Sequence, residues 1–186
     1  MKRVVVNRIV VGIGAAALLW HVDVDANWIG LRYNASGSIP VGFYWFWPSS
    51  MVPAHKCAVA KVPACDAVVA CLPGPLASYA LRNQIVDNSP MCGTGAEPVS
   101  KFLAATSPDV VEVSHAGVRI NGSLWPMSWP YALDAHGPRY TPAYRLAPRQ
   151  VLLMGFHPVS WDGRYTGSIL DTAIIGTWHP LLTWKG

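Results

Sequence analysis

Apolar and polar residues alternate along several short runs of this chain, a pattern typical of β-strands with one buried face. The clearest run, 110–120, predicts a half-buried hairpin. In its first strand Val111 and Val113 alternate with Glu112. The Asn-Gly pair at 121–122 suits a further tight turn.

Other runs of aromatic and β-branched residues predict strands over 42–47, 56–62, 67–73, 98–105, 150–156 and 172–184. Residues 74–85 form the one stretch after the N-terminal segment that suits a short helix. Residues 88–98 predict a loop, and 126–148, with five prolines, predict an irregular covering segment. The chain is therefore expected to fold as a mainly β, single-domain body.

The first 28 residues differ from this body. Three basic residues within the first eight positions precede an uncharged apolar run over 9–20, and acidic residues follow. This charge order predicts export of the body, 29–186, with the basic end inside. This uncharged run is shorter than the roughly 20 residues that cross a bilayer. We favour a retained anchor; the alternative is a cleaved signal peptide, with Val24 and Ala26 at −3 and −1.

The composition is apolar, with 52% hydrophobic and 13% charged residues. The net charge of +4 comes mostly from the N-terminus, since eleven Lys and Arg face ten Asp and Glu from residue 21 onward. The body therefore has no basic stripe for phosphates, and we expect no nucleic-acid partner. The nine tryptophans favour a membrane boundary or a peptide groove, with ordinary packing as the alternative.

Four cysteines, Cys57, Cys65, Cys71 and Cys92, lie in one stretch of the exported body. In an oxidising compartment this even number predicts disulfides, and three pairings are possible. A zinc site is the alternative, but no CxxC pair or histidine cluster accompanies the cysteines. We expect no metal and no cofactor.

Ser38 and Lys101 are the candidate residues for chemistry. Ser38 lies in NASGSIPVGFYW (34–45), which on its own also suits a plain turn. A serine hydroxyl needs a base, and the six histidines stand in no triad motif, whereas lysine is a known alternative partner. Lys101 is flanked by Val99 and Phe102, and apolar surroundings favour its neutral form. Lowering its pKa from about 10.4 to about 7–8 costs roughly 3–5 kcal/mol. Alone, Lys101 would instead be expected to extend to solvent from a strand edge.

Three motifs in order resemble the bacterial signal peptidase superfamily of serine–lysine proteases. They are SGSIP at 36–40, a lysine strand leading into the hairpin, and SWDGRYTGSI at 160–169. The resemblance spans about 34–180 and implies a signal-peptidase-type β fold. The sequence departs from the family pattern at Phe102, where arginine is usual, and at Gly163, where the box usually has serine.

The resemblance implies roles around Ser38. Ser38 would be the nucleophile and Lys101 its general base, and Ser160 would orient the lysine amine. Ser36 would join the Ser38 backbone N–H in binding the oxyanion. Gly37 would let the backbone bend so that both groups point inward.

Further roles concern support and substrate contact. Asp162 and Arg164 would form a pair that holds the closing motif in place. Ile39, Pro40 and Tyr44 are expected to contact the substrate.

The form NASGSIPVGFY, together with Cys71 and Cys92 upstream of the lysine, most resembles the conjugative-transfer branch, the TraF-type proteases. A bridge between these two cysteines would enclose the expected short helix and the loop before the lysine, and Cys57 would then pair with Cys65. The loop of about twenty residues would give a stabilisation of roughly 3 kcal/mol.

The resemblance implies a serine endopeptidase that processes an exported precursor, the pilin subunit of a plasmid transfer apparatus, after small residues. The product could be released as a cyclic chain. Expected partners are this precursor, the inner membrane and the conjugative secretion apparatus, with the catalytic domain facing the periplasm. One alternative is a general signal peptidase; another is a non-catalytic assembly component of the secretion channel.

Overall fold

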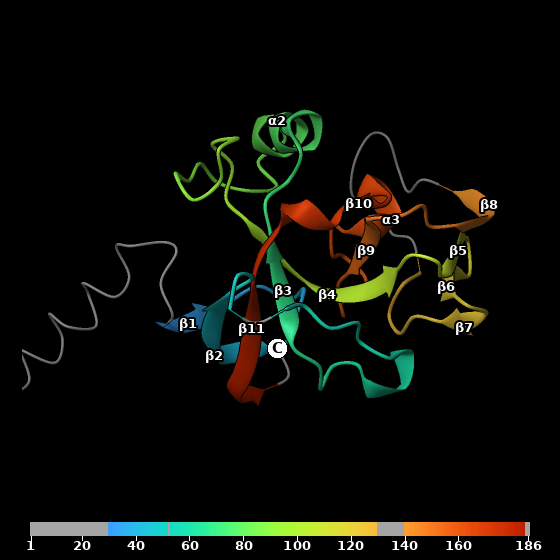
Figure 1. Cartoon of the computed structure of the whole chain (residues 1–186), viewed down its shortest axis with the longest axis horizontal. Helices are drawn as coiled ribbons and strands as arrows, with labels where there is room; N and C mark the ends of the chain where they lie inside the picture. The colour runs from blue at the N-terminus through green and yellow to red at the C-terminus, as the bar shows by residue number, and fades with distance from the viewer. Residues whose placement is uncertain (1–29, 52, 130–139, 185–186) are drawn as a thin grey trace, which may run out of the picture.

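The computed structural model describes residues 30–51, 53–129 and 140–184. The predicted N-terminal segment, 1–28, with its anchor and cleavage alternatives, lies outside them. Within the described residues the fold is mainly β, as predicted, and consists of two antiparallel sheets that lie side by side (Figure 1).

The larger sheet has seven strands and contains both chain ends of the described body. In spatial order they are β1 (Gly30–Asn34), β2 (Val41–Pro48), β11 (Ile174–Trp184), β3 (Ala67–Ala70), β4 (Val99–Thr106), β9 (Gln150–Met154) and β10 (Ile169–Leu170). The strand that carries Lys101, β4, lies between β3 and β9. Lys101 therefore does not extend to solvent from a strand edge, which is the alternative considered above for this residue alone.

The smaller sheet contains the predicted hairpin. Its order is β7 (Ser123–Leu124), β6 (Gly117–Ile120), β5 (Val110–Ser114) and β8 (Thr141–Arg145). Glu112 faces Arg119 across the hairpin, as the alternation requires. Asn121 (φ 50°) and Gly122 (φ 82°) both adopt positive φ, which suits a tight primed turn into β7.

Two α-helices and two 3₁₀ turns complete the described part of the chain: α2 (Gly74–Arg82), α3 (Gly163–Thr166), η1 (Val59–Lys61) and η2 (Asp171–Ala173). The helix expected over 74–85 is α2, which ends three residues earlier. It packs its small residues Ala77 and Ala80 against Trp161 and Tyr165. No helix within the described ranges is long and apolar enough to cross a membrane.

Two predictions of secondary structure are wrong. The run 56–62 is not a strand, because Val59–Lys61 form η1; the bridge between Cys57 and Cys65 holds the two Cα atoms at the ends of this bend 5.7 Å apart. An extended strand would separate positions eight residues apart by about 26 Å. The segment 126–148 is not wholly irregular, because it contains β8.

The two disulfides are Cys57–Cys65 and Cys71–Cys92, the pairing inferred above. The second bridge ties the end of β3 to the loop that precedes β4. It encloses α2, so the long excursion between these two neighbouring strands is anchored at both ends.

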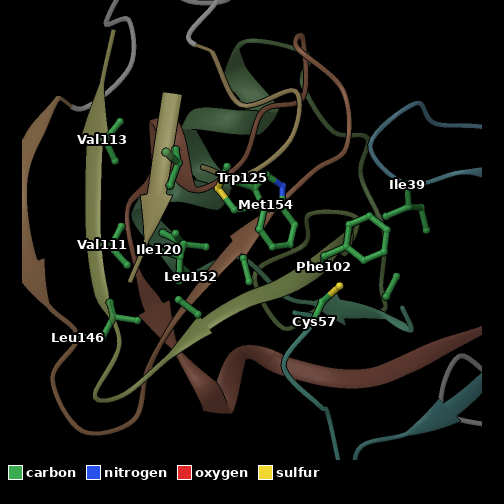
Figure 2. Close-up of a cluster of buried hydrophobic side chains, with 14 of the residues drawn as sticks. Ile39, Cys57, Phe102, Val111, Val113, Ile120, Trp125, Leu146, Leu152 and Met154 are labelled. Atoms are coloured by element: carbon green, nitrogen blue, oxygen red, sulfur yellow. The ribbon is translucent and has the colours of Figure 1, made fainter. Parts of the chain in front are cut away.

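The main hydrophobic core lies between the two sheets (Figure 2). Val111 and Ile120 of the hairpin meet Leu152 and Met154 of β9 there, with Phe102 of β4 beside them. All are at most 4% exposed. The alternation seen in the sequence thus buries one face of the hairpin against the strands that carry the site.

Candidate active site

The turn that joins β1 to β2 carries Ser38 towards the start of β4. Its side-chain oxygen Oγ lies 2.5 Å from Nζ of Lys101, although the two residues are 63 positions apart. Phe156, just after β9, donates its backbone N–H to the Ser38 carbonyl at 2.7 Å. The structure therefore brings together the predicted nucleophile and its predicted base.

Lys101 occupies an interior position of the large sheet, where it faces Val68 of β3 in the strand register. The residue is 6% exposed. This burial lowers the pKa of the amine from 10.5 to about 8; the negative charge of Asp162 opposes the shift, and the positive charge of Arg164 adds to it. A neutral amine is therefore accessible near neutral pH, as a general base requires.

Ser160 completes a triangle of polar atoms with this pair. Its Oγ lies 3.1 Å from Lys101 Nζ and 3.1 Å from Ser38 Oγ. Gly155 makes this approach possible, because a Cβ there would collide with the Ser160 side chain. The sequence analysis missed Gly155; the only signal was a glycine that ends an apolar strand, which can mark close backbone approach.

Asp162 and Arg164 form a salt bridge of 2.8 Å with both side chains fully removed from solvent. Asp162 also accepts the Gly155 backbone N–H at 2.8 Å. The guanidinium donates to backbone carbonyls of Met127, Trp129, His157, Pro158 and Ser160. The pair thus fastens the loop that carries Ser160 to the end of β9.

Ser36 does not point its hydroxyl towards an open oxyanion site. Its Oγ donates to the side-chain oxygen Oδ1 of Asn34 at 2.8 Å. Gly37 is not in the left-handed region, and a Cβ there would make only ordinary contact with the His157 ring, so the predicted need for backbone freedom is wrong. Asn34 was not among the predicted site residues.

A cleft of about 520 Å³ opens beside the dyad and contains both reactive residues. One wall is the stretch from β1 to Ser38, and the other is the segment 97–101. Apolar side chains cover much of the remaining lining: Phe46, Val69, Ile85, Val86, Met91 and Trp178. These side chains give the cleft an apolar surface beside the reactive pair.

The predicted substrate contacts lie elsewhere. Ile39 and Tyr44 are 1% and 2% exposed and belong to the core, so they are not part of the cleft lining. The Tyr44 hydroxyl instead donates to the Pro40 carbonyl at 2.6 Å. Ile39 and Tyr44 therefore support the turn from behind.

A second cavity, of about 690 Å³, lies around Leu103, Thr106 and Arg149 and contains neither Ser38 nor Lys101. Among the described residues, no three His, Cys, Asp or Glu side chains cluster as a metal site.

Comparison with known proteins agrees with this geometry. A family model described as signal peptidase, peptidase S26, matches residues 2–182. The chain belongs to this signal peptidase family. Two curated relatives, both from Escherichia coli and both named plasmid transfer protein TraF, are similar over nearly their full lengths. One is 35% identical over 99% of this chain and 98% of its own length; the other is 34% identical over 95% and 94%.

Membership of the signal peptidase family supports a serine-type peptidase activity, and the structure accounts for both departures from the family pattern. Phe102, in place of arginine, is 1% exposed and packs in the core against Trp125. A Cβ at Gly163 would crowd the Leu152 side chain and lie 2.9 Å from the Leu153 carbonyl. Neither departure changes a group at the serine–lysine pair.

Proposed function

We propose that this chain is a serine endopeptidase in which Ser38 is the nucleophile and Lys101 the general base. The observation that carries the proposal is the 2.5 Å contact between Ser38 Oγ and a buried Lys101 amine at the edge of a peptide-sized cleft. Burial keeps a large fraction of the lysine neutral near pH 8, so the amine can accept the serine proton.

The reaction follows from this arrangement. Ser38 Oγ forms a bond to the scissile carbonyl carbon while its proton passes to Lys101 Nζ. The C–N bond then breaks, and the protonated amine returns the proton to the leaving nitrogen, which leaves an acyl ester on Ser38. Water, deprotonated by Lys101, hydrolyses the ester. If an amine of the substrate itself attacks instead, the product is cyclic.

The oxyanion would be bound by the Ser38 backbone N–H and the Ser36 hydroxyl. Because the Ser36 proton points to Asn34 Oδ1 in the free enzyme, this hydroxyl must rotate when substrate enters. Ser160 would hold the lysine amine towards Ser38 through its 3.1 Å contact.

The dyad is tested with purified full-length protein and a precursor peptide that has alanine before the cut. Ser38→Ala and Lys101→Met should each abolish cleavage and retain the folded circular dichroism spectrum. Lys61→Met, at an exposed lysine, and Ser50→Ala, at an exposed serine, are the matched controls and should cleave at the parental rate. Parental cleavage by Ser38→Ala or Lys101→Met would refute the dyad.

We further propose that the substrate is an exported pilin subunit processed for plasmid conjugal transfer. The two TraF relatives, similar over nearly the whole chain, support a role in conjugal transfer. The family description supports a second candidate, a general signal peptidase. A general enzyme should rescue cells depleted of their own signal peptidase, whereas a dedicated pilin protease should fail to do so. Mass spectrometry of the mature pilin, with and without this protein, tests cleavage and cyclisation together.

A membrane-associated site facing the periplasm is the location that this function needs. Tyr33, Phe43 and Trp184 form an exposed aromatic cluster, with the first two ring centroids 5.2 Å apart and the last two 6.3 Å apart. Tyr33 of this cluster lies on β1, which begins two residues after the predicted anchor segment 1–28. Aromatic side chains of this kind favour the interface of a bilayer. Fractionation of cells, with protease added to the periplasmic side, tests this placement.

A further inference from the structure

The turn that presents Ser38 is held by a side chain outside the predicted site. Asn34, the last residue of β1, is 5% exposed and faces Gly42 of β2. Its amide nitrogen Nδ2 donates to three backbone carbonyls of the turn: Ser36 at 2.9 Å, Ile39 at 3.2 Å and Pro40 at 3.0 Å. Two N–H hydrogens shared among three carbonyls leave this amide fully engaged.

The amide oxygen of Asn34 is engaged as well. Oδ1 accepts the Ser36 backbone N–H at 3.2 Å and the Ser36 hydroxyl at 2.8 Å. The orientation of the amide is fixed by these partners, because the reversed orientation would place Oδ1 against three carbonyl oxygens. One side chain therefore binds the turn on both sides of Ser38.

Three carbonyls of the turn depend on Asn34, and the remaining supports come from other elements. Phe156 donates its N–H to the Ser38 carbonyl, and the Tyr44 hydroxyl donates to the Pro40 carbonyl. Without Asn34, the carbonyls of Ser36 and Ile39 would lose the partner described here. The Ile39 carbonyl is buried, and a buried carbonyl that lacks a partner costs about 1–3 kcal/mol, so the turn would move to find another.

We propose that Asn34 is a positioning residue for catalysis, which holds the turn 36–40 so that Ser38 Oγ lies against Lys101 Nζ. This inference rests on the proposed function, since it assumes that Ser38 is the nucleophile. Asn34 lies in the cleft wall, but its side chain bonds to the turn and not to Ser38 Oγ or Lys101 Nζ. It acts through geometry, and displacement of a reactive atom by about 1 Å can cost roughly 100-fold in rate.

The variants Asn34→Asp and Asn34→Ala distinguish the shape of the side chain from its hydrogen-bond donation to the turn. The aspartate keeps the shape but cannot donate to the three carbonyls, and the alanine loses every contact. Both should lower kcat by about 10–100-fold while KM changes less, because the opposite wall, 97–101, and the apolar lining remain. Both should also move the acid limb of kcat/KM to higher pH, since water that enters beside a loosened turn reduces the desolvation of Lys101.

Asn121→Ala is the matched control for simple destabilisation. Asn121 also makes two side-chain hydrogen bonds in a turn, to Asp109 and from the Val110 N–H, but it lies in the small sheet. This variant should unfold at a lower temperature than the parent and keep the parental kcat and acid limb when assayed well below that temperature. A fall of kcat equal to that of Asn34→Ala would overturn the proposal.

Hydrogen exchange gives a readout that does not require activity. Loss of the Asn34 hydrogen bonds should speed exchange of the Phe156 amide, which donates to the Ser38 carbonyl, by about 10-fold or more. The comparison is between an Asn34→Ala, Ser38→Ala double variant and Ser38→Ala alone. If Asn34→Ala fails to fold, Asn34→Asp is measured in the same background. Unchanged exchange together with unchanged kcat overturns the role of Asn34. Parental cleavage by Ser38→Ala alone would instead overturn the proposed function. The exchange comparison would still test whether Asn34 holds the turn.

Discussion

Arg164 Nη2 lies 2.8 Å from Asp162 Oδ2, and neither side chain is accessible to solvent. This buried pair lies on the loop after Ser160 and acts on Lys101 through charge: Asp162 raises the pKa of the amine and Arg164 lowers it. The two charges work against each other, so burial remains the main cause of the lowered pKa. A change at one partner therefore alters both stability and the titration of the lysine.

Asp162→Asn should lower the free energy of unfolding by about 3–5 kcal/mol, because it leaves the Arg164 charge buried without its partner. It should also move the acid limb of kcat/KM to lower pH, because the charge that raises the Lys101 pKa is gone. Urea unfolding and a pH–rate profile measure the two effects.

Asp171→Asn is the matched control for the buried pair. Asp171 pairs with Arg149 at 3.1 Å, with both side chains largely exposed. Exposed pairs contribute at most about 1 kcal/mol, so this variant should keep both the parental stability and the parental profile. Equal losses at the two aspartates would show that burial of the Asp162 pair is not the source of its effect.

The pH dependence of activity follows from the Lys101 pKa of about 8. Only the neutral amine accepts the serine proton, so kcat/KM should fall as pH decreases below about 8, with a single ionisation. The ring of His157 packs beside Gly37. His157→Gln should leave the acid limb in place. A limb that disappears in this variant would assign the base to histidine.

Stability should depend on the same lysine and should also rise with pH, but over a higher pH range. The pKa of Lys101 is about 8 in the folded protein and 10.5 when unperturbed, so the unfolded chain holds more protons between these values. Stability of the parent should therefore rise with pH across this window. Below pH 8 the cost of the buried lysine is fully present, roughly 3 kcal/mol.

Lys101→Met should thus be at least as stable as the parent at pH 7, even though it loses the contacts to two serine hydroxyls. Its advantage should shrink as pH rises from 8 to 10.5, since the parent lysine becomes neutral in both states. Urea unfolding of the parent and of Lys101→Met at several pH values measures the difference. Markedly easier unfolding of Lys101→Met at pH 7 would show that the lysine is held charged and paired.

The sequence predicts those parts of the fold that depend on local periodicity. The hairpin at Glu112 and Arg119 follows directly from alternation. Strand β8 was missed because Pro142 and its neighbours read as a turn-rich segment. β8 lies at the edge of the small sheet, where proline is tolerated because one side of the strand needs no hydrogen-bond donor.

The candidate site also has residues that the sequence predicts and residues that it does not. The residues inferred from motif order, Ser38, Lys101 and Ser160, meet in space. Asn34 and Gly155 could not be predicted as their supports. The role of Asn34 depends on the path of a turn, and that of Gly155 depends on an approach of Ser160 that no periodicity encodes.

The disulfide Cys71–Cys92 should affect both stability and substrate binding. It closes a loop with a sequence separation of 21, for which the chain-entropy model gives about 3 kcal/mol. Met91, next to the bridge, lines the cleft together with Ile85 and Val86 of the same loop. Replacing both cysteines with serine should lower the unfolding free energy by about this amount and raise KM for a precursor peptide. The acid limb should stay near pH 8, because the groups that bond to Lys101 or carry charge beside it lie outside the loop.

The other disulfide, Cys57–Cys65, is the control. Its sequence separation of 8 gives a similar stabilisation on the same model, roughly 2.5 kcal/mol, and neither cysteine lines the cleft. Serine at both positions should therefore lower stability to a similar degree and leave KM unchanged. Steady-state kinetics at a temperature where all variants are folded separates the two effects. If KM rises equally in both double variants, or in neither, the loop anchored by Cys92 does not form a wall of the working cleft.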